Sequence, residues 1–331
     1  MYQIHSRYSL RHTRSANHHS FWWKEIMLSV HVILVNYKNH EKTIRCLRAL
    51  EKGNVKPNTA YVIDNASTEE SRNYFKNNTF SFPVTWIYNQ QNFGFAVACN
   101  QGIRIAQEKD KNAYIWLLNN DTLPTETALE KLINTAKKLK TGITGSLIKD
   151  NSGSFSGGVG FIHPRLASVR RPHSSNEKNF NYVEGSSFLI SPECIQSVGY
   201  LSEDYFLYFE ESDYCVRAKR KGFKIGWATD SIIIHDIGSS TGSENGKGNV
   251  PFFIDCLMIR NRIHFAKKNG FPTTGRFISL AISLILRIKR LQFARIAKII
   301  QIVFSEQAFK RFIENNGGSY KISSRNQSNS L

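Results

Sequence analysis

The stretch Val32-Ile-Leu-Val-Asn-Tyr37 decides the fold class, because it is a short apolar run that ends in two polar residues. An unbroken apolar run of this length is typical of a strand buried on both faces, as in a parallel sheet covered by helices. A segment with helical spacing follows, with Ile44, Leu47 and Leu50 on one face. The start of the chain therefore predicts an α/β protein.

The same alternation continues through the first half of the chain. We expect strands at 61–64, 84–88 and 114–118, a turn at 92–96 that opens a helix to about 108, and a helix over 125–139. This order predicts a mostly parallel, Rossmann-like sheet flanked by helices. In the second half we expect loops over 151–182, a strand at 188–190, a helix from 210 to 221, two separate strands at 224–228 and 232–235, a loop at 239–250, and helices from 252 onward with a break near 270–275.

Composition narrows the class of protein. The 331 residues carry a net charge of +18, and from Phe271 to the end there are ten Lys and Arg against two acids. No stretch reaches the ~18 apolar residues that a membrane-spanning helix needs. The five cysteines are odd in number and lack a CxxC pair, which favours a reducing cytoplasm over a disulfide framework or zinc site. GxGxxG and GxxxxGK[ST] motifs are both absent from the sequence, which disfavours dinucleotide and P-loop binding.

Three segments follow from these patterns. We expect residues 1–29 to form a poorly ordered arm, with Met27 as an alternative start of translation, and residues 30–268 to form the main domain. Residues 269–331 are expected to be a basic, amphipathic helical tail. Phe277, Leu280, Ala281, Leu284 and Ile288 share helical spacing, as do Ile296, Ile299, Ile300 and Val303. A basic amphipathic helix suits an anionic membrane surface, and the alternative is a helix packed on the main domain with a solvated cationic side.

Acids and amides collect where the expected strands end, which is the edge where such sheets bind ligands. Asp121 can hold a divalent cation against a diphosphate or simply form an Asx turn. Asp64 can accept the imide N–H of uracil or thymine, or cap a helix whose capping box lies near residues 67–70. His235, at another strand end, is either a metal ligand or a structural residue.

An acidic cluster at Glu210, Glu211 and Asp213 opens the helix expected at 210–221. A carboxylate there can serve as general base for an acceptor hydroxyl, whereas acids are also common in a first helical turn. We assign Asp213 a mainly structural role, because it can pair with Arg217 at i, i+4.

Together and in order, these features resemble glycosyltransferase family 2 with the GT-A fold, and most closely its rhamnosyltransferase-like branch of bacterial surface-polysaccharide enzymes. The resemblance covers about residues 30–268. It rests on Val35-Asn-Tyr37, Val62-Ile-Asp-Asn-Ala-Ser67, Asn92-Phe-Gly-Phe-Ala96, Asn100-Gln-Gly-Ile103, Leu117-Leu-Asn-Asn-Asp-Thr122, Gly185 to Ile190, Phe206 to Arg217, His235 with Gly238 and Ser239, and Arg260-Asn261.

The resemblance implies roles for individual residues. Glu211 would be the catalytic base, and Asp121 and His235 would hold Mg or Mn. The nucleotide-sugar site would comprise Asn36, Tyr37, Asp64, Asn65, Gly94, Asn100, Asn119, Asn120 and Arg260, with Arg260 facing a phosphate. Asn119 departs from the family pattern, which has Asp at the first position of its DxD-like motif, and this weakens the expected metal site.

The resemblance also implies the reaction and its setting. The expected activity is inverting transfer of a sugar, with rhamnose the first candidate, from a dTDP- or UDP-sugar to a saccharide or lipid-linked acceptor in polysaccharide synthesis, such as that of O-antigen. The expected location is the cytoplasm, peripheral on the inner face of the membrane. Three alternatives are a non-catalytic sugar-nucleotide binder, a nucleotidyltransferase and a nucleic-acid-binding protein; no nucleic-acid partner is expected, since the acids gather at the strand ends and the basic excess in the tail.

Overall fold

The computed structural model describes residues 29–235 and 250–321. The expected N-terminal arm up to residue 28, the alternative start at Met27, the expected loop up to residue 249 and the last ten residues lie outside these ranges. No helix within the described ranges is both long enough and apolar enough to cross a membrane.

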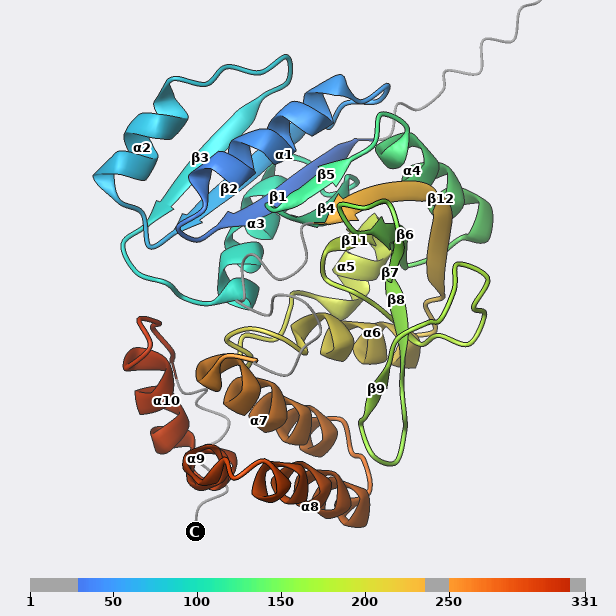
Figure 1. Ribbon diagram of the computed structural model, residues 1–331. Helices are drawn as coiled ribbons and strands as arrows, with labels where there is room; N and C mark the ends of the chain where they lie inside the picture. Colours follow the sequence, from blue (N-terminus) through green and yellow to red (C-terminus); the bar gives the residue numbers. More distant parts are fainter. Residues whose placement is uncertain (1–28, 236–249, 322–331) are drawn as a thin grey trace, which may run out of the picture.

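Nine strands of the described chain form the central sheet, in the order β3-β2-β1-β4-β11-β6-β12-β5 with β7 paired to β6 (Figure 1). They are β1 (Val30–Asn36), β2 (Thr59–Asn65), β3 (Val84–Asn89), β4 (Tyr114–Asn119), β5 (Thr122–Pro124), β6 (Ile143–Lys149), β7 (Phe155–Gly157), β11 (Ser187–Ile190) and β12 (Ile225–His235). The first four strands are parallel, as are β6 and β12. The short strands β5, β7 and β11 are antiparallel to their neighbours, so the expected mostly parallel sheet is confirmed.

Helices cover both faces of this sheet. On one face lie α1 (His40–Lys52), α2 (Glu69–Lys76) and α4 (Ala128–Leu139), and on the other α3 (Phe95–Lys109), α5 (Pro192–Val198) and α6 (Glu210–Arg220). Side chains of β1 alternate between the two layers: Val32 and Leu34 pack on the first, and Ile33 on the second. Burial on both faces is the reason why the β1 sequence is an unbroken apolar run.

The second half of the sheet differs from expectation in two places. Residues 151–182 are not only loops, because they contain β7 and most of a three-stranded sheet of β8 (Val159–Ile162), β9 (Val169–Arg170) and β10 (Tyr182–Val183). Strands of two to four residues are too short to show a period in the sequence. The two strands expected at 224–228 and 232–235 are one strand, β12, which bulges between Ala228 and Ile232.

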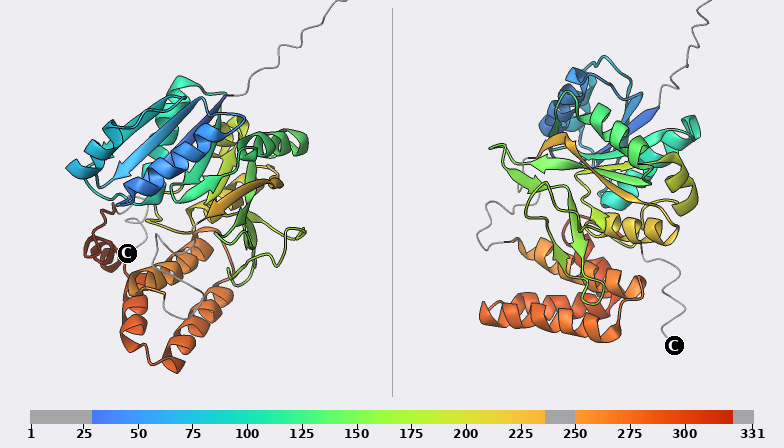
Figure 2. Two further views of the ribbon diagram at one scale, coloured as in Figure 1. Left: turned by 45° about the horizontal axis from the view of Figure 1, so that its top comes forward. Right: turned by 90° about the vertical axis from the view of Figure 1, so that its right-hand side faces the viewer.

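Four helices form a layer of their own beside the sheet domain (Figure 2). These are α7 (Phe252–Lys268), α8 (Thr273–Lys289), α9 (Phe293–Phe304) and α10 (Glu306–Glu314), with the expected break between α7 and α8. They share a hydrophobic cluster that includes Phe206 from the segment before α6. After α10 the chain returns to the sheet domain, where the Ser319 amide donates to the Asn92 carbonyl at 2.6 Å. The tail is therefore part of one packed structure with α7.

Candidate active site at the carboxyl edge of the sheet

Polar side chains meet where β1, β2 and β4 end. Asn36 and Asp64 are register partners, and the Asn36 amide donates to Asp64 Oδ1 at 2.7 Å. The Asn36 oxygen accepts from the Thr43 hydroxyl at 2.9 Å and from the Asn120 amide at 3.2 Å. Ser71 donates to Asp64 Oδ2 at 2.6 Å. The structure thus brings together three residues expected at the nucleotide site and adds Thr43 and Ser71, whose hydroxyls carried no motif in the sequence.

The capping box of α2 lies one residue later than expected. Thr68 is the N-cap, and it exchanges hydrogen bonds with Ser71. Because Ser71 also donates to Asp64, that carboxylate is tied to the helix start without capping it. Each Asp64 oxygen accepts one of these hydrogen bonds, and a carboxylate has about four lone-pair sites, so Asp64 retains the capacity to accept an imide N–H.

Asn65 holds the turn before α3. Its amide donates to Asn92 Oδ1 at 2.8 Å and to the Gly94 carbonyl at 3.2 Å, and its oxygen accepts from the Phe93 amide at 3.1 Å. Gly94 has φ +84°, and a Cβ there would overlap the Phe206 carbonyl oxygen. These two expected site residues therefore shape the loop beside Asp64. Tyr37 lies partly exposed just beyond β1, with the Lys38 ammonium 5.2 Å from its ring centroid.

Asp121 and His235, which were both expected as metal ligands, lie in contact with each other. Thr122 of β5 pairs with His235 of β12, and this register brings His235 Nε2 within 3.1 Å of Asp121 Oδ1. Within the described ranges no group of three or more His, Cys, Asp or Glu side chains is placed to hold a metal ion. A two-ligand site fits Mg or Mn when diphosphate oxygens and water supply the other ligands, which is usual for Mg sites on phosphate substrates. The imidazole favours Mn over Mg in that position.

A cavity of about 140 Å³ opens beside Asp121. Besides Asp121, it is lined by Lys42 and Arg45 of α1, by Thr122 and Leu123 of β5, and by Asn151. Two cations that line one cavity suit an anionic ligand such as a diphosphate. Sequence reasoning missed both basic residues, because among many charges on a helix nothing marked them as facing a cavity.

Three carboxyl groups gather near the start of α6. Burial, with a smaller contribution from the charge of Glu184, raises the pKa of Glu211 to about 7. Burial also raises the pKa of Glu184, which His235 opposes, and that of Glu210, where the Glu211 charge adds to the effect. Glu184 thus lies within electrostatic reach of both Glu211 and His235. A base with a pKa near the working pH is well matched to proton abstraction.

Glu184 was missed in the sequence, although it stands directly before the Gly185–Ile190 segment that carries the family resemblance. Its Oε2 accepts from the Gly158 amide at 3.2 Å, and its Oε1 is buried without a hydrogen-bond partner, 3.6 Å from Arg171 Nε. The signal available in the sequence was the position of this acidic residue directly before the Gly185–Ile190 segment.

The segment that presents Glu211 is held by strained backbone and by α7. Tyr208 and Phe209 have φ of 70° and 75°, which is unusual for residues of this size. Asn261 of α7 is fully buried and donates to the carbonyls of Leu207 and Tyr208 at 2.8 and 3.1 Å. The Arg260-Asn261 element of the family pattern therefore supports the position of Glu211 from behind.

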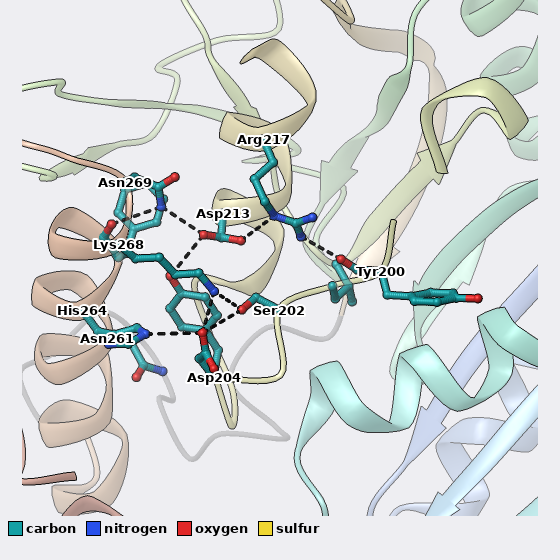
Figure 3. A network of polar contacts seen from close by, with 12 residues as sticks. Tyr200, Ser202, Asp204, Asp213, Arg217, Asn261, His264, Lys268 and Asn269 are labelled. Carbon is teal, nitrogen blue, oxygen red and sulfur yellow. Dashed lines mark hydrogen bonds and ion pairs between the residues drawn. The ribbon is translucent and has the colours of Figure 1, made fainter. Parts of the chain in front are cut away.

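Asp213 has the structural role expected for it. It is fully buried, pairs with Arg217 at 2.8 Å and accepts from Asn269 at 3.0 Å (Figure 3). Figure 3 also shows Lys268 of α7 reaching Asp204, an ion pair of 2.6 Å. These contacts fasten α6 and the 200–204 segment to α7, which agrees with a mainly structural role for Asp213.

Two expected site residues lie elsewhere. Arg260 is 3% exposed and pairs with Glu306 of α10 at 2.8 Å, while its guanidinium lies 3.6 Å from the Phe309 ring centroid. Asn100 is 1% exposed, and its amide group makes three hydrogen bonds to Leu201 and Glu203. The polar contacts of both side chains go to protein groups outside the Asn36–Asp64–Asn120 cluster, so we leave Arg260 and Asn100 out of the candidate site. Asn119 is the last residue of β4 and is half-buried, and its place in the nucleotide site stays a prediction.

Residues 30–195, half of the chain, match the family described as Glycosyl transferase family 2. The chain is similar to the low-salt glycan biosynthesis hexosyltransferase Agl10 of Haloferax volcanii, with 26% identity over 211 residues, 62% of this chain and 66% of the relative. It therefore spans just under two thirds of that relative's length.

The chain is also similar to two solved structures. GalNAc-T7 with UDP, GalNAc and Mn2+ matches with a TM-score of 0.52 and 16% identity, over 73% of this chain and 48% of that one. TarS residues 1–349 from S. aureus match with a TM-score of 0.48 and 11% identity, over 91% of this chain and 77% of that one. The fold, a mostly parallel sheet between helices, is of the GT-A type.

Proposed function

Because the chain belongs to glycosyltransferase family 2, we propose that it is an inverting, divalent-metal-dependent enzyme that transfers one sugar from a nucleotide-diphosphate sugar to an acceptor hydroxyl. The observation that carries the proposal is the contact of Asp121 with His235 at the carboxyl edge of the sheet, together with the carboxyl groups of Glu184 and Glu211, whose pKa values burial raises. Residues 30–268 would be the catalytic domain and 269–331 its basic helical tail.

The nucleotide would bind over β1 and β2. Asp64 accepts the imide N–H of uracil or thymine, and Tyr37 offers its ring beside it. Asn36, Asn65, Gly94 and Asn120 shape this pocket through the hydrogen bonds described above. The Asp64 carboxylate is preorganised by Asn36 and Ser71, so that little side-chain freedom is lost when the base binds.

The diphosphate would lie at Asp121. Lys42 and Arg45 line the cavity there and would neutralise its charge, with Asn119 at the adjoining strand end. Mn or Mg held by Asp121 and His235 would stabilise the negative charge of the departing nucleotide diphosphate.

Glu211 would act as the general base. It takes the proton of the acceptor hydroxyl while that oxygen attacks the anomeric carbon and the bond to the diphosphate breaks. One carboxylate acts as base and no nucleophilic carboxylate is assigned, so a single displacement inverts the anomeric configuration. Product with retained configuration, measured by NMR, would overturn this mechanism.

The donor sugar and setting are proposed from likeness. Rhamnose on dTDP remains a candidate, and the relative named as a hexosyltransferase and the structure solved with UDP and GalNAc favour testing UDP-hexoses beside it. We propose a saccharide or lipid-linked acceptor in cell-surface polysaccharide synthesis, such as that of bacterial O-antigen. The enzyme would then work in the cytoplasm, peripherally on the inner face of the membrane.

Calorimetric titration with UDP and dTDP tests the proposal. We expect binding of one nucleotide that needs Mn or Mg, is lost on chelation, and is lost in Asp121→Ala. Arg104→Ala, an exposed change far from the site, is the control and should bind as the wild type does. Binding of neither nucleotide under any metal condition would refute the proposal.

A further inference from the structure

The outer sides of α8 and α9 are apolar. Ten large side chains there are between 42% and 75% exposed. They are Phe277, Ile278, Ile282, Ile285, Leu286, Ile288, Leu291, Phe293, Ile300 and Phe304, and we name them the apolar face. Single exposed apolar residues are common on proteins, but a run of this size on two connected helices marks an interaction surface.

Helix α8 exposes its large apolar residues and buries small or polar ones, the reverse of an ordinary surface helix. The residues that it buries are mainly small or polar, namely Gly275, Ser279 and Ser283 with Leu280. Arg262 of α7 donates to the Ser279 carbonyl and to the Ser283 hydroxyl, which satisfies the buried side of the helix. The stripe that the sequence suggested divides accordingly, because Leu280 and Leu284 pack inward while Phe277 and Ile288 face outward. Helix α8 therefore already packs on the protein with its other side, and the exposed apolar residues are not needed for that packing.

Positive charge accompanies the apolar face. Residues 271–305 contain six Lys and Arg and no Asp or Glu. Arg287 and Arg295 pair inward with Asp255 of α7. Lys289 and Arg290, by contrast, are exposed at the corner between the two helices, among Ile288, Leu291 and Phe293.

This combination selects among partners. A second copy of the chain would set like charges against each other across a symmetric interface. A nucleic acid would leave the aliphatic side chains exposed to water, since its phosphates and base edges need polar contacts. An anionic lipid bilayer fits both features, because acyl chains take up the apolar residues and headgroups attract the cations.

We propose that the apolar face of α8 and α9, with Lys289 and Arg290 at its corner, is the surface by which the enzyme docks on an anionic bilayer. The inference rests on the proposed function only for its purpose, which is to bring the active site to a lipid-linked acceptor. The docking itself requires no donor, metal or acceptor.

Flotation of the full-length protein with vesicles tests the docking. We expect binding to vesicles of phosphatidylcholine with 30% phosphatidylglycerol to exceed binding to pure phosphatidylcholine by about tenfold or more. A variant that lacks residues from 270 onward would not test the docking alone, because α7 shares its hydrophobic cluster with α8, α9 and α10 and would lose its packing. Point substitutions on the exposed side leave that cluster intact.

Matched variants make the test specific. Leu286→Asn should weaken binding to the mixed vesicles by about tenfold, whereas Leu139→Asn on α4, which is equally exposed at 45%, should not. Lys289→Gln with Arg290→Gln should remove most of the preference for anionic vesicles, whereas Lys137→Gln with Lys138→Gln, two exposed lysines of α4, should not.

Three results would overturn the docking. They are wild-type protein that does not float with anionic vesicles, equal effects of the α8 and α4 variants, and a wild-type dimer in solution that Leu286→Asn dissociates. Titration of the same variants with UDP and dTDP separates the two proposals. Protein that binds nucleotide but does not dock would refute only the docking surface. Protein that docks but binds no nucleotide would refute only the proposed function.

Discussion

Glu211 works as a base only when its carboxyl group is ionised, and burial together with Glu184 raises its pKa to about 7. Turnover should therefore rise with pH through about 7, since the ionised base is the active form. Glu184→Gln removes the neighbouring negative charge, lowers the pKa of Glu211 and should move the acid limb of kcat/KM to lower pH.

The control for this pH profile is Glu314→Gln, an exposed acid of α10 that should leave the limb in place. An acid limb that stays fixed, or moves to higher pH, in Glu184→Gln would show that Glu184 does not act on the base.

Gly94 is required by both backbone conformation and space. Gly94→Ala places a side chain at φ +84° and against the Phe206 carbonyl, whereas Gly222→Ala also has a positive φ, +85°, but lies in open space. The backbone conformation of Gly94 alone costs a non-glycine residue about 1–3 kcal/mol. We expect Gly94→Ala to lower the free energy of unfolding by clearly more than Gly222→Ala, and to weaken nucleotide binding as well. Urea denaturation measures the first effect, and equal losses would contradict the steric argument.

At the scale of elements, α10 is anchored to α7 by one buried ion pair. Arg260→Ala leaves Glu306 without its ionic partner, although Tyr320 still donates to it, and removes the contact with Phe309, so it should lower the free energy of unfolding by about 2–4 kcal/mol. Arg104→Ala breaks an exposed pair with Glu203 and should cost at most about 1 kcal/mol.

The same two variants separate anchoring from phosphate binding. Arg260→Ala should retain the wild-type affinity for nucleotide at temperatures where it is folded. A large loss of affinity without a loss of stability would restore Arg260 to the nucleotide site.

The elements that the sequence predicted well are those with a long hydrophobic period. The apolar run of β1 identified it as a strand buried on both faces, and the helical spacing of apolar residues identified α1 as a helix buried on one side. The strands β8, β9 and β10 escaped prediction, since two to four residues carry no period. The bulge in β12 interrupts the apolar pattern between Ala228 and Ile232, so that one strand looked like two in the sequence.

At the site, the sequence predicted that Asn36, Asp64 and Asn120 lie together, because parallel strands end at one edge of a sheet. The family resemblance named Asp121 and His235 as ligands of one metal ion, and the two side chains are in contact. Partners from other elements were not predictable. Ser71 and Thr43 are ordinary helix residues in the sequence, and only the fold brings them to Asp64 and Asn36.

For the whole molecule, the fold separates the tasks of the chain. The sheet edge carries the nucleotide and metal residues, α6 carries the base, and α7 braces the segment before α6 through Asn261. The helices beyond α7 keep their apolar side chains outward and their small residues inward. The expected basic helical tail is thus a packed layer, joined to α7 through the Arg260–Glu306 pair and to the sheet domain through the hydrogen bond of Ser319 to Asn92.

The most direct test of the account is the release of nucleotide diphosphate from a panel of UDP- and dTDP-sugars by wild-type enzyme and Glu211→Gln, each with Mn and an acceptor extract. The account predicts metal-dependent release from at least one donor by the wild type. It predicts a loss of about 10²–10⁴ in kcat for Glu211→Gln, with nucleotide affinity unchanged. Equal turnover by the two proteins would contradict the assignment of Glu211 and with it the proposed mechanism.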